Sequence, residues 1–132
     1  MAQINGLTII HTTANVVDAG CDSSFQLQVV TPGGDVVRNF PDLPHNERER
    51  GRTDQYFFNL SGAGVDSDTP VFQVRMMILD DDGWLPSSIF VIGHRPGGGT
   101  VLLGSHPTWK KGSFDSGNNA GGPAQHVVSG SS

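Results

Sequence analysis

Apolar residues in this chain fall in short runs with a period of two. In the run 24–30, apolar residues at positions 25, 27 and 29 alternate with glutamines at 26 and 28. The run 71–79 repeats the pattern, with apolar residues at 72, 74, 76 and 78. Successive side chains of a β-strand point to opposite faces, so each run predicts a strand with one apolar face. We expect these two strands to line the same core.

Turn residues separate seven such runs, and this spacing is typical of an antiparallel sandwich or barrel. No segment shows a capped 3.6-residue period, and only residues 44–50 have the composition of a short helical turn, so we expect little helix. Glycine-rich segments at 32–35 and 95–99 are typical of hairpin turns. The predicted strands are residues 7–13, 24–30, 35–40, 53–60, 71–79, 87–93 and 100–104.

Two regions follow from this pattern, a β-sandwich over residues 1–114 and a tail over 115–132. Ten of the last eighteen residues are Gly, Ser, Pro or Gln, and Val127 and Val128 are the only apolar pair among them. Such a composition predicts a flexible segment, an expression remnant or a segment that a partner orders. In the sandwich, the consecutive Phe57 and Phe58 must point to opposite faces, so one lies outside the core unless something covers it.

Composition and charge narrow the classes of function. A hydrophobic content of 36% with seven Phe and two Trp is enough for a folded core. The net charge of −5 with only eight scattered Lys and Arg argues against a nucleic-acid partner. No apolar run approaches the roughly 20 residues of a membrane span, and the first residues do not resemble a secretory signal. We therefore expect a soluble chain, and the compartment stays open.

Few residues suggest catalysis. The single Cys21 has no partner for an internal disulfide, and the five histidines lack the paired spacing of a zinc site. Neither G-x-S-x-G nor H-E-x-x-H occurs, and His11 lies inside an apolar strand, where a hydrogen-bonded structural role is favoured over that of a general base. We therefore expect a protein that is not an enzyme, although a small pocket inside the sandwich would leave no trace in the sequence.

Acidic residues are concentrated in loops. The chain has eleven Asp but two Glu, and three loops, at 18–22, 41–47 and 80–83, combine Asp with Gly, Asn or Pro. Calcium prefers six to eight oxygen ligands from carboxylates, amides and backbone carbonyls, and glycine allows carbonyls to turn inward. None of the loops matches the EF-hand pattern, and Asp and Gly also make simple turns. For residues 80–82 we favour the turn.

Three segments resemble a known family in the same order. Residues 18–23 (D-A-G-C-D-S) are similar to the D-A-G-T-D-S/D opening of PLAT domains, the lipoxygenase-homology and alpha-toxin C-terminal module. Residues 49–58 resemble that family's G-x-x-D-x-[FY]-x-F segment, through Gly51 and Asp54, and the regions 74–91 and 100–109 resemble its later strands. The resemblance covers residues 7 to about 112. It implies an eight-stranded sandwich and a non-catalytic module that docks a parent enzyme onto lipid, often with calcium, and sometimes binds protein.

Carried over by position, the resemblance also implies a calcium site between two loops. Cys21 departs from the family by replacing a threonine, which removes one hydroxyl ligand, and D-G-W-L at 82–85 replaces P-D-W-F. The implied ligands are the side chain of Asp18 or Asp22 and the carbonyl of Gly20 in the first loop, and Asp42, Asn46 or Glu47 in the second.

Exposed aromatic residues would distinguish lipid docking from protein docking, since membrane-seeking loops carry Trp or Phe at their tips. Trp84 lies beside a turn and is the first candidate, although burial in the core is the favoured alternative. Trp109 precedes Lys110 and Lys111, so a ring and two cations could face anionic headgroups; equally, Trp109 could cover the core beside two solvated lysines. Two hypotheses therefore stand: calcium-assisted attachment to lipid or membrane surfaces, and a β-sandwich that binds protein or serves as an assembly subunit without lipid.

Overall fold

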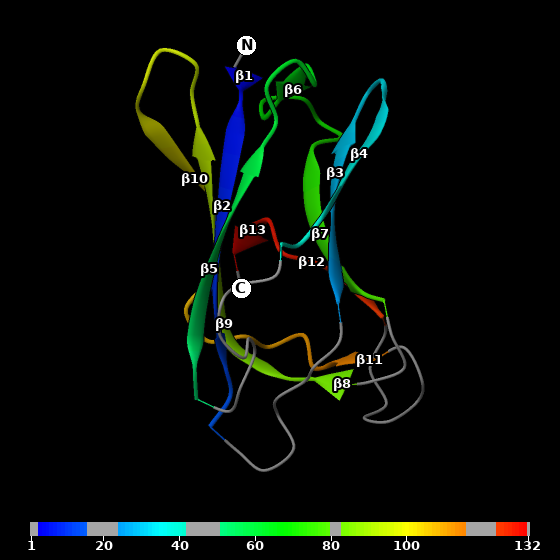
Figure 1. The fold of residues 1–132 in the computed structure, drawn as a ribbon, viewed down its shortest axis with the longest axis vertical. Coiled ribbons are helices and arrows are strands. Elements are labelled where there is room, and N and C mark those ends of the chain that lie inside the picture. The colour runs from blue at the N-terminus through cyan, green and yellow to red at the C-terminus, as the bar shows by residue number, and fades with distance from the viewer. Residues whose placement is uncertain (1–2, 16–23, 42–50, 80–82, 116–123, 132) are drawn as a thin grey trace.

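Two β-sheets packed face to face form the body of the protein (Figure 1). The computed structural model describes residues 3–15, 24–41, 51–79, 83–115 and 124–131, and these contain no helix. Their strands are β1 (Gln3–Ile4), β2 (Gly6–Thr13), β3 (Phe25–Thr31), β4 (Gly34–Asn39), β5 (Thr53–Asn59), β6 (Val65–Asp66), β7 (Gln73–Ile78), β8 (Gly83–Trp84), β9 (Pro86–His94), β10 (Thr100–His106), β11 (Phe114–Asp115), β12 (Gln125–Val127) and β13 (Gly130–Ser131).

The first sheet has the order β13-β10-β9-β2-β5, and the second has the order β12-β7-β3-β4. All pairs in them are antiparallel except β10 with β13. Two-residue pairs, β1 with β6 and β8 with β11, close the ends of the sandwich. Each of the seven predicted strands is present within a few residues of its expected bounds, and the predicted all-β sandwich is confirmed.

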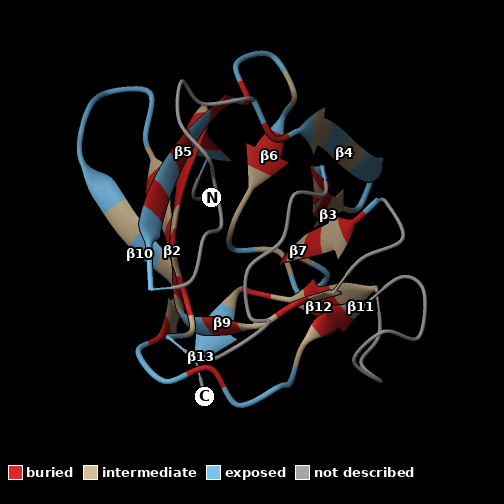
Figure 2. Ribbon diagram, turned by 60° about the horizontal axis from the view of Figure 1, so that its bottom comes forward, coloured by how far each residue is buried: buried red, intermediate tan, exposed pale blue. Residues whose placement is uncertain are grey.

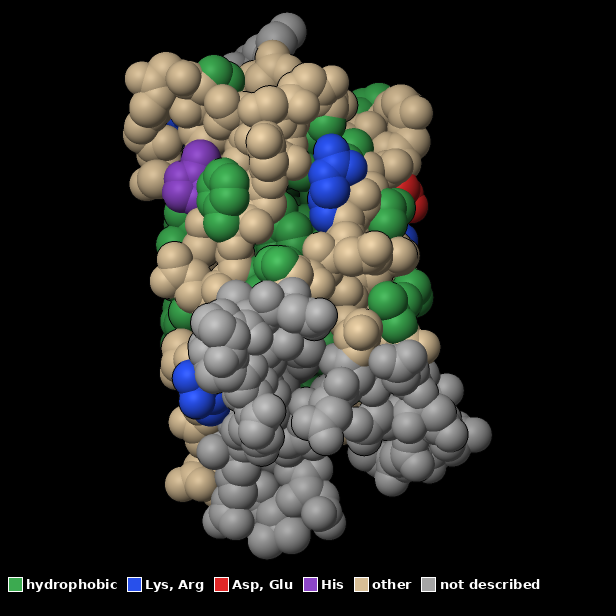
Figure 3. All heavy atoms as spheres, in the orientation of Figure 1, with side chains coloured by type: hydrophobic (Ala, Val, Ile, Leu, Met, Phe, Trp, Pro, Cys, Tyr) green, Lys and Arg blue, Asp and Glu red, His purple; other side chains and the backbone are tan. Residues whose placement is uncertain are grey.

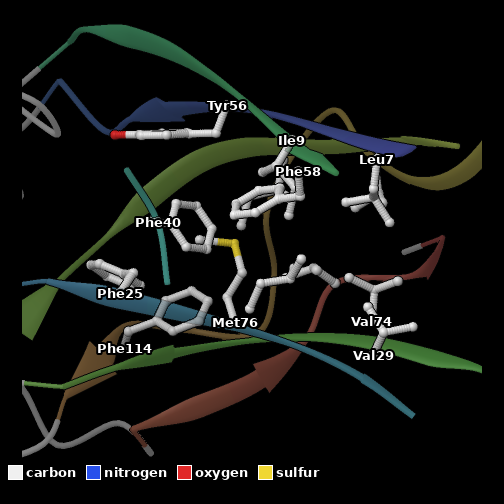
Figure 4. Close-up of a cluster of buried hydrophobic side chains, with 14 of the residues drawn as sticks. Leu7, Ile9, Phe25, Val29, Phe40, Tyr56, Phe58, Val74, Met76 and Phe114 are labelled. Carbon is white, nitrogen blue, oxygen red and sulfur yellow. The ribbon is translucent and has the colours of Figure 1, made fainter. Parts of the chain in front are cut away.

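Alternation of side chains builds the core between the sheets. Figure 2 shows buried residues alternating with exposed ones along the strands, and β5 is the clearest case, with inward positions buried and outward positions exposed. β3 and β7 are neighbours in the second sheet, and they line one core as expected. Phe58 is buried and Phe57 is 59% exposed, which confirms that the two rings lie on opposite faces. Figure 4 shows Ile9, Tyr56 and Phe58 of one sheet facing Phe25 and Met76 of the other.

Both predicted hairpins have glycine where the turn requires it. In the β3–β4 turn Gly34 has φ of 122°, and in the β9–β10 turn Gly98 and Gly99 have φ of 95° and 83°. These values lie in the region that residues with a Cβ rarely adopt, so the glycines let the chain reverse tightly. The glycine run 97–99 is therefore a hairpin turn.

The C-terminal segment corrects one expectation. Residues 124–131 do not form a flexible tail: β12 pairs with β7 of the second sheet, and β13 pairs with β10 of the first. Val128 between them is fully buried. The segment therefore joins the two sheets, because the side chain of Val128 enters the core while the backbone of the segment extends both sheets at their edges.

None of the described residues belongs to a helix long and apolar enough to cross a membrane.

Candidate functional site

The predicted calcium ligands lie in segments that the structure does not describe. Asp18, Gly20 and Asp22 fall within residues 16–23, and Asp42, Asn46 and Glu47 fall within 42–50; the aspartates 80–82 are also outside the described residues. Within the described ranges, no three His, Cys, Asp or Glu side chains come close enough to hold a metal ion. What the structure does give is the position at which each of these segments leaves and re-enters the sandwich.

The first and second segments are anchored together on one side. The backbone amide of Gly51, just after the second segment, donates to the carbonyl of Thr13 at 3.1 Å, and the amide of Thr13 donates to the carbonyl of Arg52 at 2.9 Å. A Cβ added to Gly51 would lie 3.5 Å from Oδ1 of Asn15, the last described residue before the first segment. The start of segment 16–23 and the end of segment 42–50 are therefore neighbours.

The other ends of these segments also meet. The amide of Phe40, just before the second segment, donates to the carbonyl of Phe25, and the amide of Leu79, just before residues 80–82, donates to the carbonyl of Ser24 at 2.9 Å. The amide of Ala14 bonds to the carbonyl of Leu85, just after the third segment. These bonds link the described residues that flank the three acidic segments; segments 16–23 and 80–82 leave and re-enter the sandwich at the end we call the loop end (the lower end in Figure 1), and segment 42–50 re-enters there at Gly51.

Aromatic side chains form the floor of the loop end. The indole N–H of Trp84 donates to the hydroxyl of Thr13 at 2.9 Å. The centroid of its ring lies 4.8 Å from the ring centroid of His11 and 5.2 Å from that of Phe25. Trp84 is 1% exposed. The hypothesis that it faces a lipid or partner is therefore not supported, and its burial follows from a site where the indole finds both apolar neighbours and a hydrogen-bond acceptor.

A buried carboxylate beside this floor was overlooked as a candidate site residue. Asp54 lies directly opposite His11 across the β2–β5 pair, and both residues are buried. Nε of Arg52 approaches Oδ1 of Asp54 at 3.2 Å, and this ion pair joins a half-exposed guanidinium to a fully buried carboxylate. Placing a charge there is costly unless it is paired. The G-x-x-D spacing was the signal that could have pointed to this residue.

Trp109 closes the other side of the core. Its ring is 8% exposed, stacks 5.8 Å from Phe114, and donates its indole N–H to the carbonyl of Gly112 at 2.6 Å. Lys110 and Lys111 are exposed, and Nζ of Lys111 bonds to the carbonyl of Val127 at 2.9 Å and lies 5.7 Å from the Trp109 ring. Of the two alternatives for Trp109, the structure shows the ring covering the core beside exposed lysines.

Two histidines hold the C-terminal segment against this corner. Nε2 of His106 donates to the carbonyl of Val128 at 3.0 Å, and Nε2 of His126 donates to the carbonyl of Ser113 at 2.8 Å. Burial is the main cause that lowers the pKa of both imidazoles, and the charge of Lys111 lowers them further, against the opposing effect of these hydrogen bonds. Both side chains therefore favour the neutral form in the folded protein.

The geometry of the loop end can bring ligands from separate segments to one ion, as a shared calcium site requires. Carboxylates, an amide and backbone carbonyls in those segments have the donor chemistry that calcium prefers. The described residues alone make no such site.

Comparison with protein-family models finds no match, and no curated protein matches the chain. Solved structures do. The alpha-toxin of an avian strain of Clostridium perfringens matches 95% of this chain with a TM-score of 0.66 at 22% identity. The alpha-toxin of Clostridium absonum matches 77% with a TM-score of 0.62 at 23% identity. Coral 8R-lipoxygenase matches 94% with a TM-score of 0.61 at 14% identity, and its structure is described as showing calcium activation via a C2-like domain.

The match covers only part of each of these proteins. This chain spans 31% and 32% of the two toxin chains and 16% of the lipoxygenase chain. At such low identity the likeness establishes the fold alone. Lipoxygenase and alpha-toxin are nevertheless the two kinds of protein after which the PLAT class is described, and both recur here independently of the sequence motifs. The chain therefore has the β-sandwich fold of the PLAT/C2-like type.

Proposed function

We propose that the chain is a non-catalytic binding module that attaches to lipid or membrane surfaces with the help of calcium bound at the loop end. The observation that carries the proposal is that described residues flanking the three acidic segments bond to one another at the loop end, through the backbone groups of Thr13, Gly51 and Leu79. The likeness in fold to coral 8R-lipoxygenase supports the choice of calcium, because calcium activates that enzyme via a C2-like domain.

The proposed ligands come from two segments. Calcium bound there would offset the repulsion between their carboxylates and offer its remaining coordination positions to phosphate oxygens of a lipid headgroup. Exposed Lys110, at the edge of the Trp109 corner, would add attraction for an anionic surface. The proposed ligands are Asp18, Gly20, Asp22, Asp42, Asn46 and Glu47.

Calcium binding is tested by thermal unfolding with calcium, with magnesium and with EDTA. A ligand that binds only the native state stabilises it by RT ln(1 + [L]/Kd), about 2.7 kcal/mol at a hundredfold excess over Kd. We expect calcium to raise the Tm of the wild type, and Asp22→Ala to abolish the rise. Asp35→Ala is the matched control, because Asp35 is exposed in the β3–β4 hairpin rather than at the loop end. The proposal is contradicted if calcium leaves the Tm of the wild type unchanged, or if Asp22→Ala and Asp35→Ala change the calcium-induced rise of Tm equally.

Lipid attachment is tested by co-sedimentation with anionic vesicles in calcium and in EDTA. We expect pelleting in calcium, little in EDTA, and weaker pelleting for Lys110→Gln. If the protein stays in the supernatant under both conditions, the lipid step is wrong and the protein-binding alternative takes its place.

A further inference from the structure

The two outer faces of the sandwich differ in chemistry. On the four-stranded sheet, outward glutamines and an arginine bond to one another: the Gln125 amide donates to Gln28, Gln28 to Gln26, and Arg75 to Gln73. On the five-stranded sheet, the outward positions of β2, β5, β9 and β10 carry no Asp, Glu, Lys or Arg. In Figure 3 the acidic side chains in view lie on the right, away from the histidine and its hydrophobic neighbour on the left.

Large apolar side chains occupy this uncharged face. Phe57 and Leu102 are 59% and 60% exposed, the two most exposed large hydrophobic residues of the described chain. Ile10, Phe90 and Ile92 between them are half-buried, and alternation directs them outward because Ile9, Ile89 and Val91 are in the core. We call the outward-facing set the outer apolar face; it consists of Phe57, Leu102, Ile10, Phe90 and Ile92. The ring of Phe57 also packs edge to face against that of His94, with 5.6 Å between the ring centroids.

The register gives this face an approximate two-fold arrangement. One row across the sheet reads Phe57, Thr8, Ile92, Leu102, and the next reads Gln55, Ile10, Phe90, Ser105. Neighbouring strands lie about 4.8 Å apart, so Phe57 and Leu102, at the two ends of the first row, are separated by about 14 Å. A line that runs parallel to the strands, midway between β2 and β9, divides each row in half. A rotation of 180° about this line exchanges the two ends of each row.

We propose that the outer apolar face is a self-association surface, on which a second copy of this chain stacks sheet to sheet. The two-fold axis runs along the strands between β2 and β9. Phe57 of one copy then packs against Leu102 of the other, and Ile10 packs against Phe90, so each contact occurs twice, as in an isologous dimer. Stacked sheets of this kind pack about 10 Å apart.

The lack of charged side chains on this face fits a second copy of the chain better than an anionic membrane. The net charge of −5 on each copy opposes self-association, so the face that adds no further like-charge contact is the one at which this opposition is smallest. The outer apolar face meets that condition, and it lacks the basic side chains that attract anionic membranes. The cores of protein–protein interfaces are likewise depleted of charged residues and rich in aromatic and other apolar ones.

The size of the face sets the expected strength. Four strands of about seven residues present about 450 Å², compared with about 800 Å² per partner in a standard interface. The dimer should therefore be weak. Sedimentation velocity is suited to this, at protein concentrations from about 10 μM to about 1 mM. EDTA in every sample removes any contribution from calcium at the loop end, which makes the result independent of the proposed function.

The variants place opposite charges on the two ends of the row. We expect the wild type to shift from monomer to dimer across the concentration range, and Phe57→Glu and Leu102→Lys each to weaken dimerisation at least about tenfold. An equimolar mixture of the two variants should associate again, because residue 57 of one copy meets residue 102 of the other. Both positions are exposed, and a melting curve verifies the fold of each variant.

The control is Val37→Ser, which removes an exposed apolar side chain (43% exposed) from the four-stranded sheet and should leave dimerisation unchanged. A monomeric wild type throughout, dissociation by Val37→Ser but not by Phe57→Glu, or a mixture that fails to recover would each overturn the proposal. Binding of the monomer to uncharged vesicles through Phe57 would overturn it too, and would identify the face as a membrane contact.

Discussion

Val128 provides a direct test of the C-terminal segment. It is fully buried, its amide donates to the carbonyl of Val74 at 2.8 Å, and its carbonyl accepts from His106. Val128→Ala keeps these hydrogen bonds, apart from effects of repacking, and removes two methyl groups from the core. At about 0.8 kcal/mol for each carbon, the transfer loss is about 1.6 kcal/mol, and the cavity raises the cost to about 2–2.5 kcal/mol.

The adjacent Val127 is the matched control. Its side chain is half-buried and points away from the core, so Val127→Ala should change the free energy of unfolding by less than about 0.5–1 kcal/mol. For a chain of 132 residues, the cost at Val128 corresponds to a Tm lower by about 6–12 °C. Thermal and urea unfolding followed by circular dichroism measure both. Equal, near-zero effects of the two substitutions would refute the reasoning and restore the interpretation of residues 124–131 as a solvated tail.

Two further predictions concern the core and pH. Phe58→Ala should destabilise the fold by about 3–5 kcal/mol, whereas Phe57→Ala should cost less than about 1 kcal/mol, because only the first ring is buried; urea unfolding compares the two. The free energy of unfolding should fall as the pH drops below about 6.5, because the unfolded chain takes up protons that buried His106 and His126, with their lowered pKa values, resist. Urea titrations from pH 7.5 to pH 5 measure this loss of free energy, and the double variant His106→Gln/His126→Gln should reduce it. If the double variant loses as much free energy of unfolding over this pH range as the wild type does, the prediction is contradicted.

Strand positions could be predicted well because their cause is local. The alternation in β3, β5 and β7 sets which side chains are buried, and the glycines of the two hairpins permit the turns wherever the strands pair. The short strands were missed for the opposite reason. β1, β6, β8 and β11 are two residues long, so no period can show, and they exist because a distant segment offers a backbone partner.

The candidate site divides in the same way. The composition of the acidic segments indicated calcium chemistry, and the structure adds only that their anchoring residues, such as Thr13 and Gly51, share one end of the sandwich. The aromatic candidates depended on tertiary packing. Whether Trp84 lies on a surface or in the core is decided by Thr13 and Phe25, which no local pattern connects to it.

By itself, then, the sequence determined the strands, the hairpins, the all-β class and the type of donor atoms in the loops, because period, turn chemistry and side-chain chemistry are properties of neighbouring residues. Only the tertiary structure decided the fate of the C-terminal segment, the burial of Trp84 and Trp109, and the pairing of rows that gathers Phe57 and Leu102 on one uncharged face. Those outcomes depend on contacts between residues far apart in the chain. Residues 124–131 are ordered because β7 and β10 offer free backbone groups at the sheet edges and the core accommodates the side chain of Val128.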